Sequence, residues 1–338
     1  MIPSRPGQRT LLCILDWGLG HASRSLALAN ALEEAGEAVF FASCGRAKKF
    51  IESERPGTKV YELPGYNVTY PTRSMPLNVA LQFPRWMVTI WRERRCCATL
   101  VQELRIDRIV SDNRFGCYVP RTRSVFLTHQ LHPITNSRLV SRIYRAYLQR
   151  FDEFWVPDFA EAKHRVSGQL SGRRNYGHVQ YIGPLSRLSA GMAEQQERGV
   201  SVLTVMALLS GPEPMRTQLE AIVVAQLSTV PGNHVLVRGL PGSANHLPDL
   251  PNNITVYDFA DAALLSRLLP AAEHIICRSG YSTLMDVYAV TTGKKLILVP
   301  TPGQTEQVYL AKREARRIGC IAVPEQEDLD LDKILSLR

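Results

Sequence analysis

Short apolar runs alternate with longer helical stretches along the whole chain. In the first half, apolar runs bounded by polar residues predict strands at residues 10–17, 37–43, 59–65, 106–112 and 123–129. Residues 22–36 carry alanine and leucine on one helical face and stop at Gly36, which is typical of a helix end. Strand–helix alternation of this kind predicts a doubly wound α/β domain with a parallel sheet.

The second half repeats this architecture without an exact internal repeat. Its strand candidates are residues 201–209, 234–239, 253–259, 274–280 and 295–300. Between the halves, residues 155–200 mix glycine, proline, serine and charge without a clear core pattern. We therefore predict a Rossmann-like domain over residues 1–157, an interdomain region over 158–199 and a second Rossmann-like domain over 200–338. Two such domains facing across a cleft would bind ligands at the carboxyl ends of their strands.

Composition agrees with two folded domains. The chain has 338 residues, of which 45% are hydrophobic and 21% charged, and these values exclude a disordered chain. No apolar run approaches the roughly 18 to 20 residues that a membrane span needs. The seven cysteines include no CxxC pair and no metal-ligand spacing. We expect free thiols, a reducing cytoplasm, no metal site and no cofactor.

The net charge of +9 arises entirely in the first half, where residues 1–155 hold 22 Lys and Arg against 13 Asp and Glu. Residues 81–95 interleave Trp86 and Trp91 with four arginines at helical spacing. This pattern favours contact with an anionic membrane, which would make the protein peripheral on the inner face of the membrane. A core helix with an arginine-rich exposed face, a part of a substrate site and a simple solubility bias are the alternatives. No nucleic-acid-binding motif accompanies the charge, so we expect no nucleic acid partner.

The first segment that could take part in catalysis or binding joins the first strand to the first helix. Gly18 and Gly20 allow a sharp turn and a close approach of a ligand to the backbone. His21 follows them at the start of the helix, and a helix-capping role is its alternative. Asp112 ends another strand, where its carboxylate could accept the His21 Nδ1–H, fix the tautomer and raise the basicity of Nε2. A loop-capping role is the alternative for Asp112.

Two further residues of the first half end predicted strands. Asn113 directly follows Asp112, and His129 ends the neighbouring strand. His129 is a rival base or a contact to the substrate that accepts the transferred group. We expect Gly18, Gly20, Asn113 and His129 to bind that acceptor.

The second half contains a strand, a Ser-Gly turn and a helix start at two places. Ser210 and Gly211 precede a proline and a helix that carries Arg216 in its first turn, which suits a phosphate. Residues 277–286 run from a strand through Arg278-Ser279-Gly280 into a helix with Ser282, Thr283 and Asp286. Hydroxyls and free N–H groups suit a diphosphate, and Asp286 is placed to accept two ribose hydroxyls. After the next strand, Gln304, Glu306 and Gln307 could hold sugar hydroxyls.

These segments resemble inverting glycosyltransferases of the GT-B fold, in the family 28 branch that includes the MurG-type N-acetylglucosaminyltransferase. GLGHASRSLALANAL is similar to the first glycine loop and helix of the family, and RSGYSTLMD to its Arg-Ser-Gly-x-x-Thr-x-x-Glu, with Asp286 in place of glutamate. Ser210 stands at the serine of the second glycine loop, although Leu208 and Leu209 replace the usual glycines. Glu306 and Gln307 stand where the family places its sugar-reading pair.

The resemblance implies an acceptor in the first domain and a nucleotide-sugar donor in the second. It implies inverting, metal-independent transfer of a sugar, such as N-acetylglucosamine, from a UDP-sugar to a hydroxyl of a lipid-linked or anionic acceptor, with His21 as base and Asp112 orienting it. A UDP-sugar 2-epimerase on the same fold and a non-catalytic nucleotide-sugar-binding protein are the alternatives. The residues expected to bind the donor are Ser210, Gly211, Arg216, Phe259, Arg278, Ser279, Gly280, Ser282, Thr283, Asp286, Gln304, Glu306 and Gln307.

Overall fold

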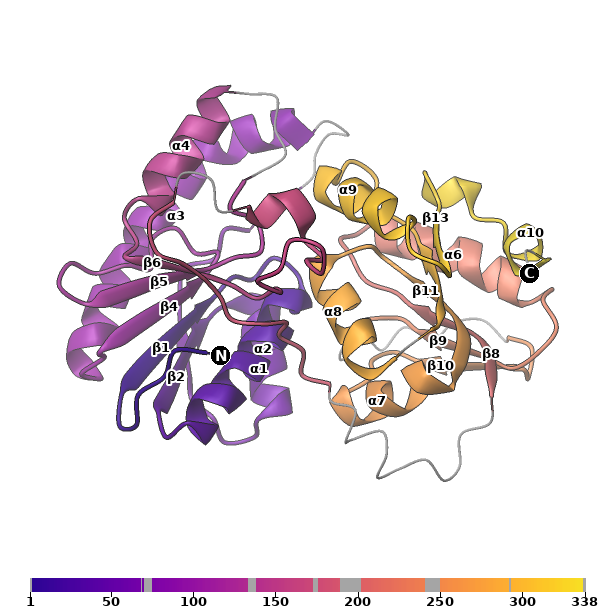
Figure 1. Ribbon diagram of the computed structural model, residues 1–338, viewed down its shortest axis with the longest axis horizontal. Helices are drawn as coiled ribbons and strands as arrows, with labels where there is room; N and C mark the ends of the chain where they lie inside the picture. Colours follow the sequence, from indigo (N-terminus) through magenta and orange to yellow (C-terminus); the bar gives the residue numbers. More distant parts are fainter. Residues whose placement is uncertain are drawn as a thin grey trace. The chain divides into compact units, whose positions relative to one another are not determined.

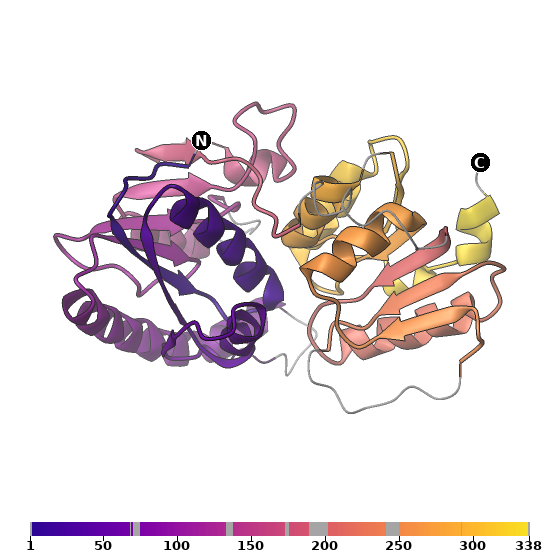
Figure 2. The ribbon, with the colours of Figure 1, turned by 90° about the horizontal axis from the view of Figure 1, so that it is seen from below.

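The protein forms two compact units, Met1–Leu185 and Ser186–Arg338. A computed structural model describes residues 2–67, 69, 75–132, 138–172, 176–188, 202–240, 250–291 and 293–336 (Figure 1). Each unit contains one all-parallel sheet with helices on both faces (Figure 2). The predicted α/β class with two Rossmann-like domains is confirmed.

The first unit has a seven-stranded sheet in the order β3-β2-β1-β4-β5-β6-β7. The strands are β1 Arg9–Ile14, β2 Ala38–Ser43, β3 Val60–Glu62, β4 Arg108–Asp112, β5 Arg123–Leu127, β6 Glu153–Val156 and β7 Val179–Tyr181. The chain order reverses between the neighbours β1 and β4. In doubly wound sheets such a reversal leaves a crevice at the carboxyl ends of the two strands, and ligands bind there.

Helices of the first unit pack on both faces of this sheet. They are α1 Leu19–Glu34, α2 Gly45–Glu54, α3 Met75–Glu103 and α4 Arg138–Leu148, with a 3-10 turn at Gly168–Ser171. Cys97 and Leu100 of α3 lie in one apolar core with Leu11 and Cys13 of β1. The regions of β1 and β2 contact α1 on the opposite face (Figure 2). Alternate residues of β1 therefore point to opposite faces of the sheet, and helices cover both faces, as in doubly wound domains generally.

The second unit has a six-stranded sheet in the order β10-β9-β8-β11-β12-β13. The strands are β8 Leu203–Leu208, β9 His234–Val237, β10 Ile254–Tyr257, β11 Ala272–Cys277, β12 Lys295–Leu298 and β13 Cys320–Ala322. The helices are α6 Met215–Leu227, α7 Ala262–Ala271, α8 Tyr281–Val290, α9 Thr305–Glu314 and α10 Leu331–Ser336, with a 3-10 turn at Gln326–Asp328. The order again reverses between two neighbours, here β8 and β11. Each unit therefore has one such crevice position.

The first unit is longer than the predicted residues 1–157. Residues 158–185 belong to it, because β7 pairs in parallel with β6 and completes the same sheet. This strand has only three residues, all of them half-buried, and such a short segment leaves little apolar periodicity to recognise. The part of the predicted interdomain region at residues 189–199 lies outside the described residues.

Candidate active site

The loop between β1 and α1 brings the glycine-histidine segment to the reversal point of the first sheet. Gly18 has a φ of 89°, a value that L side chains rarely adopt, and it is the residue before the helix begins. His21 therefore lies in the first turn of α1. Asp112 is the last residue of β4, the strand beside β1. The loop before α1 and the end of β4 thus lie at the same edge of the sheet.

His21 and Asp112 form a hydrogen-bonded pair. Nδ1 of His21 lies 2.8 Å from Oδ1 of Asp112, and the histidine side chain keeps 16% of its surface exposed while the aspartate keeps 2%. Burial lowers the pKa of His21, and Asp112 opposes that shift. The imidazole is thus unprotonated at neutral pH. A proton on Nδ1 leaves a lone pair on Nε2, for which no hydrogen-bond partner occurs in the described ranges.

A buried guanidinium completes this cluster. Arg24 donates from Nε to Oδ2 of Asp112 at 2.9 Å and from Nη2 to Oδ1 of the same carboxylate. Ser25 Oγ donates to Oδ2 at 3.0 Å. Burial alone would raise the pKa of Asp112, but the charge of Arg24 and the hydrogen bonds from Arg24 and His21 outweigh it and hold that pKa well below its usual range. Asp112 is therefore a carboxylate throughout the physiological range of pH.

The other two polar residues predicted for this site differ in their roles. His129 is buried and joins the cluster, since its Nδ1 lies 2.9 Å from Nη1 of Arg24. Asn113 follows Asp112 with a φ of 57°, and asparagine tolerates this left-handed conformation better than most residues do. Asn113 thus turns the chain directly behind the carboxylate, and its contact with an acceptor stays a prediction.

Sequence reasoning did not find an aromatic group beside this cluster. Trp17, in the loop before His21, is 42% exposed, and its ring centroid lies 6.4 Å from that of Trp86 on α3. Tyr66 meets Trp86 edge-on at 6.5 Å and donates its hydroxyl to Glu93 at 2.8 Å. These residues are far apart in the sequence, so only the tertiary fold reveals the group. Trp17, Trp86 and Tyr66 are called the aromatic group below.

Arg114 anchors the aromatic group to the sheet. It pairs with Glu93 at 2.7 Å, with both side chains fully buried, and donates to the carbonyls of Ile14 at 2.7 Å and Pro64 at 2.9 Å. The guanidinium of Arg114 thus connects α3 to the chain just after β3 and to the end of β1, three residues before Trp17. This network holds the loop and the aromatic group in place.

In the second unit, the two Ser-Gly turns lie at the reversal point of the sheet, after the neighbouring strands β8 and β11. Gly211 has a φ of 106°, and a Cβ built on it would lie 3.4 Å from Thr301 Oγ1 and 3.8 Å from Arg278 Nε. Both of these polar atoms are buried and have no hydrogen-bond partner among the described residues. Buried polar groups are usually satisfied, so an unpaired donor and hydroxyl converging on one glycine are consistent with a ligand site.

The structure corrects the predicted phosphate contact of Arg216. This side chain is buried and pairs with Glu213 at 2.5 Å and Glu220 at 2.9 Å. Glu220 also pairs with Arg238, which in turn contacts Asp258 at 2.6 Å. A buried cation is retained where carboxylates neutralise it, and Arg216 is already neutralised in this way.

The terminal nitrogens of Arg278 are likewise hydrogen-bonded within the protein. Its terminal nitrogens donate to the carbonyls of Pro300 at 2.9 Å and Met215 at 2.8 Å and to Gln326 Oε1 at 2.8 Å. Burial lowers its pKa to about 10, which leaves it charged at neutral pH. Arg278 thus braces the loops that follow β11 and β12, while its Nε lacks a hydrogen-bond partner among the described residues. Its contact with a donor stays a prediction.

The remaining predicted donor residues surround the same strand ends. Asp286 Oδ1 accepts a hydrogen bond from Ser186 Oγ at 2.6 Å, and Ser279 Oγ donates to the carbonyl of Gln307 at 2.8 Å. The Gln307 side chain accepts from the backbone of Thr301 and donates to Gln304 Oε1 at 2.6 Å. Gln304 and Gln307 thus stabilise the loop after β12. Half-buried positions are occupied by Ser210, Phe259, Gly280, Ser282, Thr283 and Glu306.

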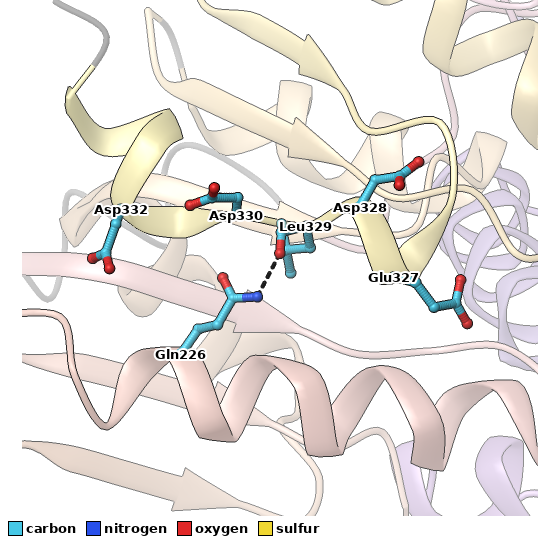
Figure 3. A pocket seen from close by; sticks show the side chains of 6 residues that line it. All are labelled: Gln226, Glu327, Asp328, Leu329, Asp330 and Asp332. Atoms are coloured by element: carbon cyan, nitrogen blue, oxygen red, sulfur yellow. Dashed lines mark hydrogen bonds between the residues drawn. The ribbon is translucent and has the colours of Figure 1, made fainter.

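The acidic C-terminal segment, residues 328–332, leads into α10, and its three aspartates are exposed. Asp330 accepts from the Lys333 backbone at 3.0 Å and so caps α10. A hollow of about 380 Å³ is lined by Gln226, Glu327, Asp328, Leu329, Asp330 and Asp332 (Figure 3). Within this lining, the side chain of Gln226 donates a hydrogen bond to the Leu329 carbonyl (Figure 3). Its carboxylates would repel a diphosphate, so the hollow is unsuited to a nucleotide sugar.

All seven cysteines are free thiols, as expected. Cys13, Cys97 and Cys117 gather with their sulfurs within 4.8 Å of one another. All three belong to the apolar core between β1 and α3. Burial raises the pKa of the Cys117 thiol well above its ordinary value, so it is not a thiolate at neutral pH. These cysteines act as small core side chains.

Solved structures to which this chain is similar include glycosyltransferases. The Streptomyces nogalater glycosyltransferase SnogD is 17% identical with a TM-score of 0.63, over 98% of this chain and 90% of that one. Acinetobacter baumannii MurG is 14% identical with a TM-score of 0.58, over 98% and 90%. Both likenesses are at the level of the fold, which is GT-B.

Residues 240–336 match the glycosyltransferase family 28 C-terminal domain. An uncharacterized glycosyltransferase of Methanosarcina acetivorans is 23% identical over 327 residues, which cover 88% of this chain and 81% of the relative. The chain is a GT-B glycosyltransferase with a family 28 C-terminal domain. The matched domain of this glycosyltransferase includes both turns after β11 and β12. Its relatives favour group transfer over the epimerase and the non-catalytic binding protein that the sequence left open. No helix in the described part of this glycosyltransferase is long and apolar enough to cross a membrane.

Proposed function

We propose that this glycosyltransferase moves a sugar from a UDP-sugar, with UDP-N-acetylglucosamine as the first candidate, to an acceptor hydroxyl with inversion and without a metal ion. The observation that carries the proposal is the His21–Asp112 pair at the reversal point of the first sheet, in a chain whose second unit matches family 28. Inverting transfer needs one base for the acceptor proton, and this pair supplies one.

In the proposed reaction, Nε2 of His21 takes the proton of the acceptor hydroxyl as its oxygen attacks the anomeric carbon. The bond from that carbon to the diphosphate breaks on the opposite face, which inverts the configuration. Asp112 holds the imidazole in the reactive tautomer and stabilises the imidazolium. The diphosphate leaves against the backbone N–H groups at the starts of α6 and α8 and the hydroxyls of Ser210 and Ser282.

The acceptor would bind over the first unit. The aromatic group offers Trp17 as a stacking surface four residues before His21. Indole rings stack on flat apolar surfaces, including the C–H faces of sugar rings. Gly18 and Gly20 allow the backbone to approach the acceptor closely, while Asn113 and His129 add polar contacts. An acceptor with a ring next to its reactive hydroxyl fits this combination.

Donor binding tests the proposal directly. Calorimetry with a panel of nucleotide sugars and bare nucleotides should find saturable binding of one UDP-sugar. Asp286→Ala should weaken that binding by about 10-fold or more, because a charge-assisted hydrogen bond is worth roughly 1.5–3 kcal/mol. The matched control is Asp332→Ala, which removes a carboxylate of the acidic hollow and should bind donor like the wild type.

A second variant separates a direct contact from a structural role of Asp286. Ser186→Ala removes the hydrogen bond to Asp286 but keeps the carboxylate. If Asp286 reads the ribose, this variant retains most of the affinity. Equal losses of donor affinity in both variants would mean that Asp286 acts through its hydrogen bond to Ser186 and does not contact the nucleotide. Absence of binding for every nucleotide tried would contradict the proposed donor.

We also propose that α3 contacts an anionic membrane surface, on which a lipid-linked acceptor would be presented and the cytoplasmic enzyme would be peripheral. Leu81, Val88 and Trp91 are 61%, 49% and 53% exposed, an unusual amount of apolar surface for one helix. Exposed arginines interleave with them, and Arg95 stacks over Trp91 at 3.8 Å. Aromatic and basic residues together are typical of helices that lie on anionic lipid.

Sedimentation with vesicles of phosphatidylglycerol and phosphatidylcholine tests this contact. Each basic residue near an anionic surface contributes about 1 kcal/mol, so Arg92→Ala with Arg95→Ala should reduce binding by about 30-fold at low salt. Arg46→Ala with Lys49→Ala, on the exposed face of α2, removes the same charge elsewhere and is the control. Equal losses in the two double variants would reveal a nonspecific charge effect and contradict a docking role of α3.

A further inference from the structure

We infer that Arg24 is a positioning residue that sets His21 and His129 in opposite tautomers and keeps His21 unprotonated in the resting enzyme. The inference rests on the proposed role of His21 as base. It concerns a buried side chain of α1 to which sequence reasoning gave no role, although it stands one helical turn after His21. Its contacts alone distinguish it from the other arginines of the first unit.

Arg24 lies at the centre of the cluster. Its guanidinium is 2% exposed and reaches three groups from three elements. Nε lies 2.9 Å from Asp112 Oδ2 on β4, Nη1 lies 2.9 Å from Nδ1 of His129 after β5, and Nη2 lies 3.1 Å from Nδ1 of His21 on α1. Among the described residues, the charged and titratable groups that act on His21 are Asp112, Arg24 and His129. A rigid planar fork with five N–H donors suits such a junction, whereas the point charge of a lysine does not.

The donors of Arg24 settle the tautomer of His129. A guanidinium has no acceptor, so Nη1 must donate to Nδ1 of His129. The ring hydrogen of His129 therefore lies on Nε2. This histidine can donate from Nε2 but cannot serve as a base through it.

The tautomer of His21 is the opposite. Its Nδ1 is 2.8 Å from an oxygen of Asp112, and two bare lone pairs at that distance would repel each other. The hydrogen must lie between them, on Nδ1. Nη2 of Arg24 directs one of its two hydrogens to the same oxygen, so both nitrogens donate to Oδ1. The 3.1 Å approach of Nη2 to Nδ1 then places two donors side by side without a hydrogen bond between them. Nε2 of His21 then carries the lone pair that the proposed reaction needs.

Arg24 also sets the charge balance of the cluster. Asp112 paired with Arg24 is close to neutral before His21 takes up any proton. Protonation of His21 therefore places a net positive charge in a buried site, which is unfavourable. Without Arg24, the same proton would neutralise Asp112 and would be favourable. The guanidinium thus keeps the imidazole unprotonated before the reaction and favours release of the proton that the imidazole takes up.

The first test needs no substrate and leaves Arg24 in place. In ¹⁵N-histidine-labelled wild-type protein, the imidazole ¹⁵N shifts should identify an Nδ1–H tautomer for His21 and an Nε2–H tautomer for His129. His21→Gln and His129→Gln assign the two signals. An Nε2–H tautomer for His21, or the same tautomer for both rings, overturns the inference.

The second test removes the guanidinium. In Arg24→Met, the pKa of the His21–Asp112 pair should rise by about one unit or more, because an opposite charge within hydrogen-bond reach shifts a pKa by about 1–3 units. The acidic limb of the kcat/KM profile should move to higher pH by the same amount, and the His129 tautomer should become mixed. A loss of activity with an unmoved histidine pKa would show a merely structural role and overturn the inference.

A conservative variant guards against misfolding. Arg24→Lys keeps the charge but not the fork, so it should retain the low histidine pKa while the His129 tautomer becomes mixed. A lysine variant with wild-type tautomers contradicts the inference even where the methionine variant does not fold. The histidine spectra do not depend on the identity of donor or acceptor. The histidine spectra can therefore be interpreted even if the proposed transferase reaction is not observed.

Discussion

Replacing His21 by alanine is expected to lower kcat by about 100-fold or more while donor affinity stays near that of the wild type. A positioned general base contributes typically 10²–10⁴-fold, and no second base in the cluster can take its place. The Nδ1 atom of His129 accepts from Arg24, and Asp112 is held at both oxygens. Neither group is arranged to receive the proton of an acceptor hydroxyl.

The measurement is steady-state turnover with a saturating donor, alongside calorimetry of the same variant. Asp112→Asn is the companion, because it keeps the shape of the pair and removes the charge that stabilises the imidazolium. It should lose less activity than the alanine variant at His21 if orientation is the main role of Asp112. Near-normal kcat in His21→Ala would refute the assignment of the base, and a parallel loss of donor affinity would point to misfolding.

The second large effect concerns stability. Arg114→Met should lower the free energy of unfolding by about 3–5 kcal/mol, because removal of one member of a buried ion pair strands the other. Glu93 would keep only the Tyr66 hydroxyl and the Gly116 N–H, at 2.8 and 3.0 Å. Urea unfolding measures the change. The pair of Lys48 with Glu62, 27% and 64% exposed, provides the control, and Lys48→Met should cost less than about 1 kcal/mol.

The loss in Arg114→Met should depend on pH in a defined direction. Burial already raises the pKa of Glu93, and loss of the Arg114 charge raises it further. A group with a raised folded pKa loses its stabilising contribution as pH rises from the unfolded value through the folded one. The difference in the free energy of unfolding between variant and wild type should therefore be largest near neutral pH. It should become smaller toward about pH 4, where Glu93 is largely protonated in both the folded and the unfolded protein. A gap that widens on acidification would contradict this account.

Strand ends were the part of the site that the sequence could locate. Buried parallel strands appear as short apolar runs, and the polar residues that follow them meet at one edge of the sheet. This is why His21 and Asp112, 91 positions apart, were expected together and lie within hydrogen-bond distance. The strand that ends in Arg278-Ser279-Gly280 was placed by the same signal.

The partners of charged side chains could not be located in this way. Arg216 and Arg278 look like phosphate ligands because each begins or precedes a helix. Glu213 and Glu220, within four residues, already neutralise Arg216, whereas carbonyls from distant segments hold the terminal nitrogens of Arg278. Arg24 likewise has distant partners, which lie 88 and 105 positions away. For Arg278 and Arg24 the hydrogen-bond partners depend on long-range packing, which the local sequence pattern does not show.

Each unit has a hydrophobic core of its own. The core that joins α6 and α10 to the second sheet contains only residues of the second unit, and the cores beside α3 and β6 contain only residues of the first. Substitutions in any of these cores therefore repack residues of one unit. If the donor binds to the second unit, as proposed above, a new donor preference could evolve through changes in that unit. Chimaeras that exchange the second unit with that of a relative are accordingly the natural starting point for redesigning its sugar specificity.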